Sequence, residues 1–393
     1  SDGTPLTTKD VIASIKRWGA RDNLGAKLLA AAEKLEAKDD RTFTLDFKKP
    51  FGMVLDAFSK PSSIPLFVMP EKVAQTDPFK QITDMTGSGP YMFAADRYRP
   101  GEKVVYLKNP YYVPRNEPAD GTAGGKHVYV DELDWVILRD AQTVANAIEK
   151  GEVDVVEMVP NEQYSVLKKN PDIQLLNQTG KQSAMLHLNH AIPPFNNPKI
   201  AQAALMAINQ AALQRAQIVH KELWNTCTSI YPCGSLYASG KPQFKRAQEL
   251  LKEAGYDGTP VVLMLPADMP SLNKYPPVMA ELLRRAGFKV DLQSMDWATL
   301  VTRRTKSSPV SEGGWNGFIT FNPLFFAPLT GSGLKGWFGW TDDPKLEALK
   351  DEFVGTSDLA KRKELAEGIQ LRVMDSGVYG MLGEAKPIIA LRK

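Results

Sequence analysis

The sequence predicts an α/β protein with mixed sheets that is organised as two lobes. Its 393 residues are enough for two or three hydrophobic cores. Before residue 183 the apolar residues mostly alternate, as in strands, whereas after it apolar strands and amphipathic helices follow one another regularly. Residues 183–189 form an apolar run of strand length between the two parts. We therefore expect this run to be a crossing from one lobe to the other.

The first part begins with a predicted helix over residues 6–18. Thr7 precedes Asp10 at the spacing of a capping box, and apolar residues recur on one helical face. Residues 42–47 alternate as a strand. Residues 53–80 contain several prolines among small apolar clusters, which predicts irregular packing rather than regular helices.

The rest of the first part predicts further strands and one helix. Residues 87–91 and 99–102 read as turns that lead into strands, with strands at 104–107 and 128–138 and an exposed loop at 113–126. Asp140 is the predicted N-cap of a helix that ends at Gly151, where glycine adopts a left-handed conformation at little cost. A strand at 153–156 follows, and a helix that leads into a new strand is typical of a mixed or parallel sheet.

The second part begins with a helix predicted from Asn197, which is the N-cap, and Pro198, which takes the first helical position. Apolar residues at helical spacing extend this prediction to Ala212 as one buried helix. Further along the chain, strands are expected at 261–265, 288–293 and 313–321, and helices at 278–286 and 297–304. This order implies right-handed crossovers and an α/β sheet.

In such sheets, ligands collect at the carboxyl ends of the strands. This rule draws attention to Asp268, Asp296, Trp315 and the residues after Thr320.

The composition excludes several classes of protein. Charged residues make up 24% and hydrophobic residues 43%, as in ordinary globular domains, so extensive disorder and fibrous structure are excluded. The net charge of +3 is too small to indicate a nucleic-acid partner. No apolar run approaches the roughly 18 residues that a bilayer span requires.

The only cysteines, Cys227 and Cys233, lie close together in the sequence. We expect a disulfide that closes a small loop and contributes about 2 kcal/mol. The alternative is a metal pair or a redox dithiol, but there is no CxxC spacing and no second pair of ligands nearby. Two cysteines in this arrangement favour an oxidising compartment.

The sequence contains no recognisable catalytic motif. Its four histidines, His127, His187, His190 and His220, fit neither a zinc motif nor a serine-nucleophile motif, although a metal or haem pair at His187 and His190 stays open as an alternative. Acidic pairs at 39–40 and 342–343 are interpreted as solvated caps. We therefore expect a protein that is not an enzyme and has no cofactor or metal.

Seven segments in a consistent order resemble the family 5 extracellular solute-binding proteins, the dipeptide, oligopeptide and nickel receptors of ABC importers. They are the opening Asp-Gly-Thr-Pro-Leu-Thr with its helix, Gly-Ser-Gly-Pro-Tyr at 87–91, Leu-Lys-Asn-Pro-Tyr-Tyr at 107–112, Gly-Glu-Val-Asp at 151–154, Leu-Asn at 188–189, Pro-Phe at 194–195, and residues 247–256.

The resemblance implies a two-lobed periplasmic-binding-protein fold of the cluster C type with a hinge of two crossings. Lobe I would comprise residues 1–182 and the return segment 380–393, and lobe II residues 183–379. The second crossing would lie near residues 379–389, and family members extend beyond both ends of this sequence. The implied protein is a monomeric periplasmic or lipid-anchored receptor, whose partners are a peptide or other small solute and the membrane permease.

The resemblance also suggests a ligand site. Peptide-binding members carry a Gly-Trp motif followed by an aspartate for the peptide ammonium, but here Gly314-Trp315-Asn316-Gly317 is followed by Phe318, and Asn322 replaces a second acidic residue. A buried ammonium without a carboxylate is costly, so an opine, a sugar, or a haem or nickel ligand is the alternative to a peptide. The aromatic residues near this motif are Trp297, Trp315, Phe318, Phe321, Phe325, Phe326, Trp337, Phe338 and Trp340. The predicted ligand contacts are Trp315, Asn316, Phe318, Thr320, Asn322, Trp297, Asp268 and Trp340.

Overall fold

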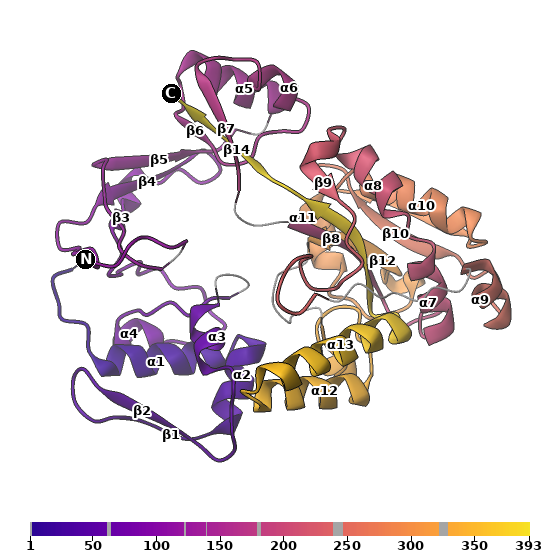
Figure 1. The fold of residues 1–393 in the computed structure, drawn as a ribbon, viewed down its shortest axis with the longest axis horizontal. Coiled ribbons are helices and arrows are strands. Elements are labelled where there is room, and N and C mark those ends of the chain that lie inside the picture. Colours follow the sequence, from indigo (N-terminus) through magenta and orange to yellow (C-terminus); the bar gives the residue numbers. More distant parts are fainter. Residues whose placement is uncertain are drawn as a thin grey trace. The chain divides into compact units, whose positions relative to one another are not determined.

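The computed structural model describes residues 2–60, 64–121, 123–138, 140–178, 182–238, 247–321 and 329–393. The chain divides into two compact units, residues 1–143 and 144–393, which are considered separately (Figure 1).

The first unit begins with helix α1 (Thr8–Gly19), and its predicted capping box is confirmed. The Thr7 amide donates to Asp10 Oδ2 at 2.8 Å. Helix α2 (Asn23–Ala31) leads into the antiparallel hairpin of β1 (Ala32–Ala37) and β2 (Phe43–Phe47). The proline-rich region that was predicted to be irregular contains two short helices, α3 (Val54–Ser59) and α4 (Glu71–Ala74).

The remainder of the first unit is an antiparallel sheet in the order β3-β4-β5. Its strands are β3 (Tyr91–Phe93), β4 (Lys103–Lys108) and β5 (Glu132–Val136), with η1 (Ala95–Arg97) after β3. Strand β3 begins at the end of the predicted turn at 87–91, β4 contains the predicted strand 104–107, and β5 lies within the predicted strand 128–138.

The second unit contains a small sheet in the order β6-β14-β7. Helix α5 (Ala141–Lys150) precedes it, and the predicted cap is confirmed because Asp140 Oδ1 accepts from the Thr143 amide at 2.8 Å. Gly151 follows with a φ of +73°, a conformation that favours glycine. The elements of this sheet are β6 (Val155–Val156), α6 (Tyr164–Leu167), β7 (Ile173–Asn177) and β14 (Ile388–Arg392).

The main sheet of this unit has six strands in the order β11-β10-β12-β8-β13-β9. Strand β10 pairs in parallel with β11 and β12, whereas β8 pairs antiparallel with β12 and β13, so the sheet is mixed as predicted. The strands are β8 (Gln182–Leu188), β9 (Trp224–Asn225), β10 (Val261–Pro266), β11 (Val290–Met295), β12 (Gly317–Phe321) and β13 (Tyr379–Ala385).

The predicted single helix after Asn197 is two helices, α7 (Pro198–Met206) and α8 (Gln210–Gln217). The break occurs because the Asn209 side chain accepts from the Ala212 amide at 3.1 Å and so begins a new helix. Apolar side chains of α7, α8 and α10 pack with Leu186 and Leu263 in the largest core cluster of the unit. The other helices here are η2 (Lys221–Leu223), α9 (Ala247–Glu253), α10 (Tyr275–Arg285), α11 (Trp297–Arg303), η3 (Val310–Glu312) and η4 (Gly333–Lys335).

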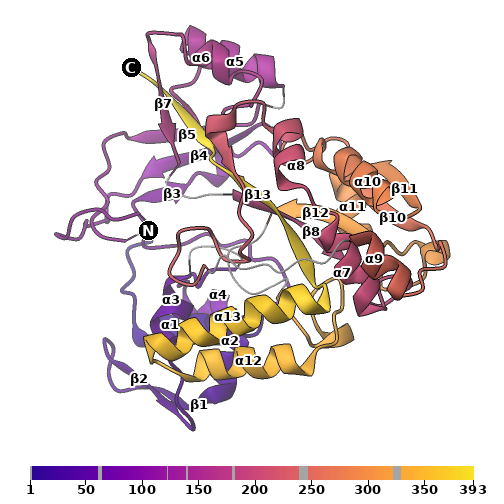
Figure 2. The ribbon, with the colours of Figure 1, turned by 45° about the vertical axis from the view of Figure 1, so that its right-hand side comes forward.

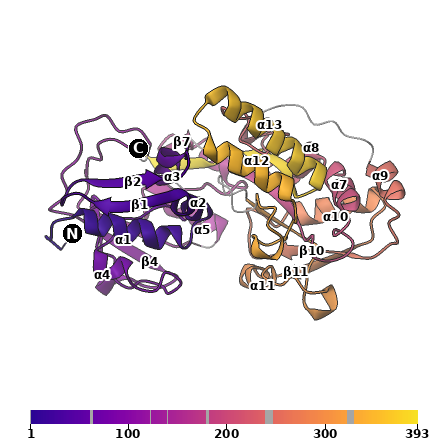
Figure 3. The same ribbon diagram turned by 90° about the horizontal axis from the view of Figure 1, so that it is seen from below.

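The last two helices in chain order are long. They are α12 (Pro344–Gly355) and α13 (Leu359–Ser376), which pack side by side (Figure 3). Asp343, which was predicted to be a solvated cap, does cap α12, but its side chain is buried.

The chain passes twice between the two sheets of the second unit. It leaves the small sheet after β7 and enters the main sheet at β8, and it returns from β13 to β14. Figures 1 and 2 show the return as the long yellow ribbon that ends at the carboxyl terminus. The return takes place at Lys386 and Pro387, because β13 still pairs with β8 from Tyr379 to Ala385.

Candidate functional site

The carboxyl edge of the parallel strands brings together two of the predicted site residues. Asp268 follows β10 and Trp297 follows β11, and Asp268 Oδ1 accepts from the Trp297 amide at 2.7 Å. Asp296 accepts from the Thr299 amide at 2.8 Å and caps α11. Both carboxylates therefore hold the start of α11 at the sheet edge and position the Trp297 side chain.

Trp315 and Asn316 lie at the opposite end, because β12 begins after them. Both side chains are fully buried. Trp315 Nε1 donates to the Arg304 carbonyl at 3.1 Å. Asn316 Nδ2 donates to the Pro193 carbonyl at 2.8 Å, and its Oδ1 accepts from the Val262 amide at 2.8 Å. These bonds give both residues a structural role in this unit; contact with a ligand stays a prediction.

An aromatic layer covers the face of the main sheet opposite the α7, α8 and α10 core. We use this name for Trp297, Trp315, Phe318, Trp337, Phe338 and Trp340. Trp315 and Phe318 pack edge-to-face at 4.9 Å between ring centroids, and Trp337 and Phe338 lie 5.0 Å apart. Trp315 and Phe318 are fully buried and form the base, whereas Trp297, Trp337 and Phe338 are half-buried.

His187 is enclosed beneath this layer. Its ring lies 4.8 Å from the Trp337 ring and 5.6 Å from the Phe318 ring, and its Nε2 donates to the Phe338 carbonyl. Burial lowers the pKa of His187 to about 3, and burial also lowers the pKa of His190 to about 4. Both imidazoles are therefore neutral at pH 7.

Arg304 is the functional candidate that sequence reasoning missed. Its Cζ lies 5.0 Å from the Phe338 ring centroid and 5.8 Å from those of Trp297 and Trp337. Its Nε is buried without a hydrogen-bond partner in the described part of the chain. The sequence did contain a signal, because Trp297 and Arg304 are seven residues apart and therefore share one helical face.

The guanidinium of the neighbouring Arg303, unlike that of Arg304, is held by hydrogen bonds within the unit. Its Nε donates to the Gly313 carbonyl at 3.1 Å, and its terminal nitrogens donate to Gln293 Oε1 at 2.6 Å and to the Gly314 carbonyl at 2.8 Å. Arg303 is thus fully engaged within the unit, whereas Arg304 is available to another group.

The other residues predicted to contact the ligand are found in the following places. Thr320 lies on β12 and is partly exposed, and Trp340 is buried in the aromatic layer at 6.0 Å from Trp315. Asn322, Phe325 and Phe326 lie outside the described residues.

The predicted disulfide is present between Cys227 and Cys233. The loop that it closes is also anchored by side chains. Gln210 Nε2 donates to the Cys227 carbonyl at 2.6 Å, and the Cys233 amide donates to Glu384 Oε1 at 2.6 Å. These two cysteines and Glu384 form the only cluster of possible metal ligands found in the described ranges, but the disulfide occupies both sulfur atoms.

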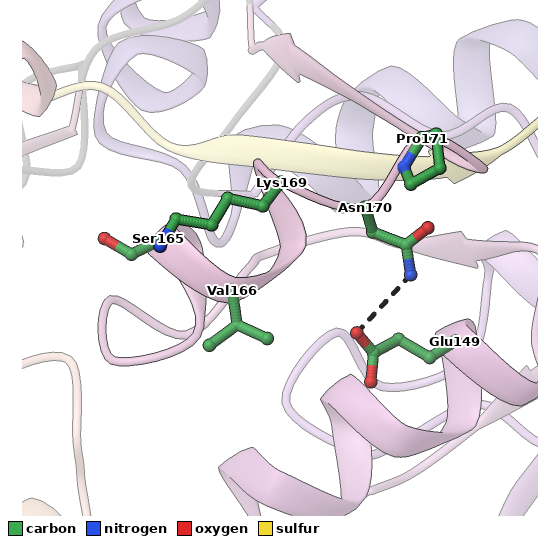
Figure 4. Close-up of a pocket in the computed structure, with 6 residues that line it drawn as sticks. All are labelled: Glu149, Ser165, Val166, Lys169, Asn170 and Pro171. Atoms are coloured by element: carbon green, nitrogen blue, oxygen red, sulfur yellow. Dashed lines mark hydrogen bonds between the residues drawn. The ribbon is translucent and has the colours of Figure 1, made fainter.

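Two concave surfaces of the second unit lie outside the aromatic layer. A polar hollow of about 480 Å³ is lined by Glu149, Lys169 and Asn170, and Asn170 Nδ2 donates to Glu149 Oε1 at 3.4 Å (Figure 4). A cavity of about 430 Å³ lies between α7, α8, the disulfide loop and β13. Neither has a half-buried cation without a partner in its lining, so the aromatic layer around Arg304 is the stronger candidate.

Solved structures show that this fold is that of periplasmic binding proteins. The chain superposes over its whole length on 79% of AgaA from A. tumefaciens R10, in complex with agropinic acid, with a TM-score of 0.78 and 22% identity. It also superposes on 80% of NikZ from Campylobacter jejuni, in complex with Ni(L-His), with a TM-score of 0.80 and 15% identity.

Sequence comparison identifies the family. Residues 1–337 match the model of the bacterial extracellular solute-binding proteins, family 5. The chain is 36% identical to the probable peptide ABC transporter periplasmic-binding protein y4tO of Sinorhizobium fredii, over 94% of this chain and 72% of that protein. The chain therefore belongs to family 5 of the extracellular solute-binding proteins, the receptors of ABC importers. None of the helices in the described ranges combines the length and apolar character needed to cross a membrane.

Proposed function

We propose that the protein captures a peptide or peptide-like solute between two lobes and delivers it to the membrane permease of an ABC importer. The observation that carries this proposal is the partly exposed aromatic layer at Trp297, Trp337 and Phe338. Aromatic walls with few polar groups suit amphiphilic solutes such as peptides. The relative y4tO, whose name describes a peptide receptor, supports the same solute class.

The lobes of this proposal are residues 1–182 with the return segment 386–393, and residues 183–385; the return segment is shorter than the predicted 380–393, because β13 pairs with β8 up to Ala385. Solute contacts from both lobes would stabilise a closed state, and the permease would recognise that state. The two passages of the chain, β7 to β8 and β13 to β14, support this assignment, because a hinge needs few connecting segments.

The protein acts in the periplasm or as a lipid-anchored extracellular receptor, as a monomer and without catalysis, cofactor or nucleic-acid partner. The extracellular family and the disulfide support this location. Binding-protein relatives support the absence of catalysis.

The alternative solute is an opine. The structural neighbour AgaA is in complex with agropinic acid, and Phe318 replaces the aspartate that would pair with a peptide ammonium. An opine lacks the free peptide amino terminus and so needs no such aspartate.

Native mass spectrometry of the gently purified protein tests both candidates. A co-purified ligand whose fragments are peptide ions would support the first proposal, and an amino-acid–sugar conjugate would support the opine. If no ligand is retained, the dialysed protein is incubated with a tryptic digest and with agropinic acid, and the bound fraction is analysed. Failure to retain either would contradict the proposed function.

A matched pair of variants locates the binding site. Trp297→Ala should reduce retention of the ligand at least about tenfold, because it removes one half-buried wall of the aromatic layer. Leu371→Ala removes a hydrophobic side chain that is 45% exposed on α13 and outside the layer, and should leave retention unchanged. Equal retention by both variants would contradict the placement of the site.

A further inference from the structure

We infer that Arg304 binds a carboxylate group of the solute, so that the protein selects anionic solutes with an apolar body. This inference rests on the proposed solute-binding function and names the chemical class of its ligand. It begins with geometry, because Trp297, Trp337 and Phe338 surround the guanidinium at 5.0 to 5.8 Å from its Cζ. Aromatic faces at this distance attract a cation and hold its plane in place.

Arg304 has no counter-ion among the described residues of the second unit. Burial lowers the pKa of Arg304, and no carboxylate opposes that effect among the described residues. The segments outside the described ranges contain no aspartate or glutamate, so they cannot supply one. Two other cations of this unit with reduced exposure have carboxylate partners: Lys350 pairs with Glu347 at 2.7 Å, and Arg372 pairs with Asp343 at 2.7 Å.

The nitrogen atoms of Arg304 are also unsatisfied. Nε is buried without a partner, and no hydrogen bond is found between the terminal nitrogens and the described residues. A buried donor without an acceptor is unfavourable, and an incoming acceptor removes that cost. The planar fork of a guanidinium matches the two oxygens of a carboxylate, and the aromatic surroundings strengthen the pairing by excluding water.

The same surroundings define the rest of the ligand. A carboxylate at Arg304 places the neighbouring atoms of the solute against the half-buried rings of Trp297, Trp337 and Phe338. Suitable ligands therefore carry a carboxylate next to an aromatic or aliphatic group, as does the carboxyl terminus of a peptide or an N-acylated amino acid. A second explanation is that Arg304 only stabilises the layer by cation–π contacts.

Two probes that differ only in charge separate these explanations. N-acetylphenylalanine carries the carboxylate, and N-acetylphenylalaninamide replaces it with a neutral amide. Each is titrated into the dialysed full chain, and binding is followed by tryptophan fluorescence, since Trp297 and Trp337 border Arg304. The proteins are the wild type, Arg304→Gln, Arg304→Lys, and the control Arg285→Gln, which removes a well-exposed arginine of α10.

The wild type and the control should bind the acid at least about tenfold more tightly than the amide, as expected for a charge-assisted, two-point hydrogen bond. Arg304→Gln should abolish this preference, and Arg304→Lys should restore part of it, because lysine keeps the charge without the planar fork. Thermal melting checks that each variant is folded. Equal binding of acid and amide by the wild type, or no response to either probe, would overturn the inference, as would an unchanged preference in Arg304→Gln.

The outcome is independent of the test of the proposed function. If tryptic peptides are retained but the acid is not preferred, the receptor function stands and the role of Arg304 is wrong. If the acid is bound in an Arg304-dependent manner but neither peptides nor agropinic acid are retained, the carboxylate site stands and the proposed solutes are wrong.

Discussion

Arg372 on α13 donates from Nε to Asp343 Oδ2 at 2.7 Å, and so joins α13 to the residue that begins α12. The Asp343 side chain is only 2% exposed, whereas that of Arg372 is 35% exposed. Ser376 also donates to Asp343 Oδ2, and the Leu346 amide donates to Oδ1 at 3.1 Å. One carboxylate therefore caps α12 and holds the two long helices together.

Asp343→Asn should lower the free energy of unfolding by about 2 kcal/mol, since it removes a helix cap of full charge and a partly buried ion pair. Burial alone would raise the pKa of Asp343, but the hydrogen bonds from Arg372 and Ser376 outweigh it and lower the pKa. A lowered folded-state pKa gives stability that is present above the unfolded value and is lost as the pH falls through the folded one.

Urea denaturation at pH 7 and at pH 3 measures both effects. The variant should be less stable at pH 7 and should lose less stability on acidification than the wild type. Asp342→Asn, which removes the adjacent exposed carboxylate, is the control. A variant as acid-sensitive as the wild type would show that Asp343 does not contribute to the pH dependence.

The buried histidines predict a second pH effect at milder acidity. Burial lowers the pKa of His187 to about 3 and that of His190 to about 4, both below the ordinary value of 6.5. The unfolded chain therefore binds protons first, and stability falls as the pH drops from about 6.5 toward the folded values. At pH 5 each histidine should cost about 1–2 kcal/mol relative to pH 7.

His190→Gln should flatten the decline in urea midpoint between pH 7 and pH 5, whereas His127→Gln, which removes an exposed imidazole, should not. In NMR spectra, the His187 ring protons should not titrate above pH 4. Titration of His187 near pH 6.5 would contradict its burial.

The local signals in the sequence were enough for much of the fold, and long-range pairing explains what they missed. The capping box at Thr7 and Asp10 and the cap at Asp140 involve only neighbouring residues, so they can be read directly. The break at Asn209 was missed because apolar spacing continues through it. Trp315 was expected at the carboxyl end of a strand, but it precedes β12, which pairs with β8 and β10 only from Gly317. Where a strand begins depends on its pairing partners, which the sequence does not reveal.

The candidate site was predicted only in part, because it also depends on contacts between distant segments of the chain. Aromatic composition drew attention to Trp297 and Trp340, which the structure places in one layer. Arg304 was overlooked because an arginine at a helix end is ordinarily a solvated charge. Its significance depends on Trp337 and Phe338, which come from a distant segment of the chain.

The disulfide should stabilise the protein without controlling solute binding. Cys227→Ser with Cys233→Ser should lower the free energy of unfolding by about 2 kcal/mol, as expected for a short closed loop. The loop should stay in place because Gln210 also accepts from the Cys227 amide at 2.7 Å and Ser229 donates to Gln370 at 2.7 Å. Thermal melting and ligand titration of the double variant test this; a loss of affinity would show that the loop takes part in binding.

Truncation of Trp315 should mainly reduce stability, whereas truncation of Trp297 should mainly reduce solute binding. Trp315 is fully buried, so Trp315→Ala should lower the free energy of unfolding by about 3–5 kcal/mol through the cavity that it leaves. Trp297 is half-buried at the edge of the layer, so Trp297→Ala should cost much less stability and instead weaken solute binding. Denaturation and ligand titration of both variants separate the two roles. If Trp315→Ala were as stable as the wild type but bound the solute at least tenfold more weakly, Trp315 would be a ligand contact after all, and the base of the aromatic layer would belong to the binding surface.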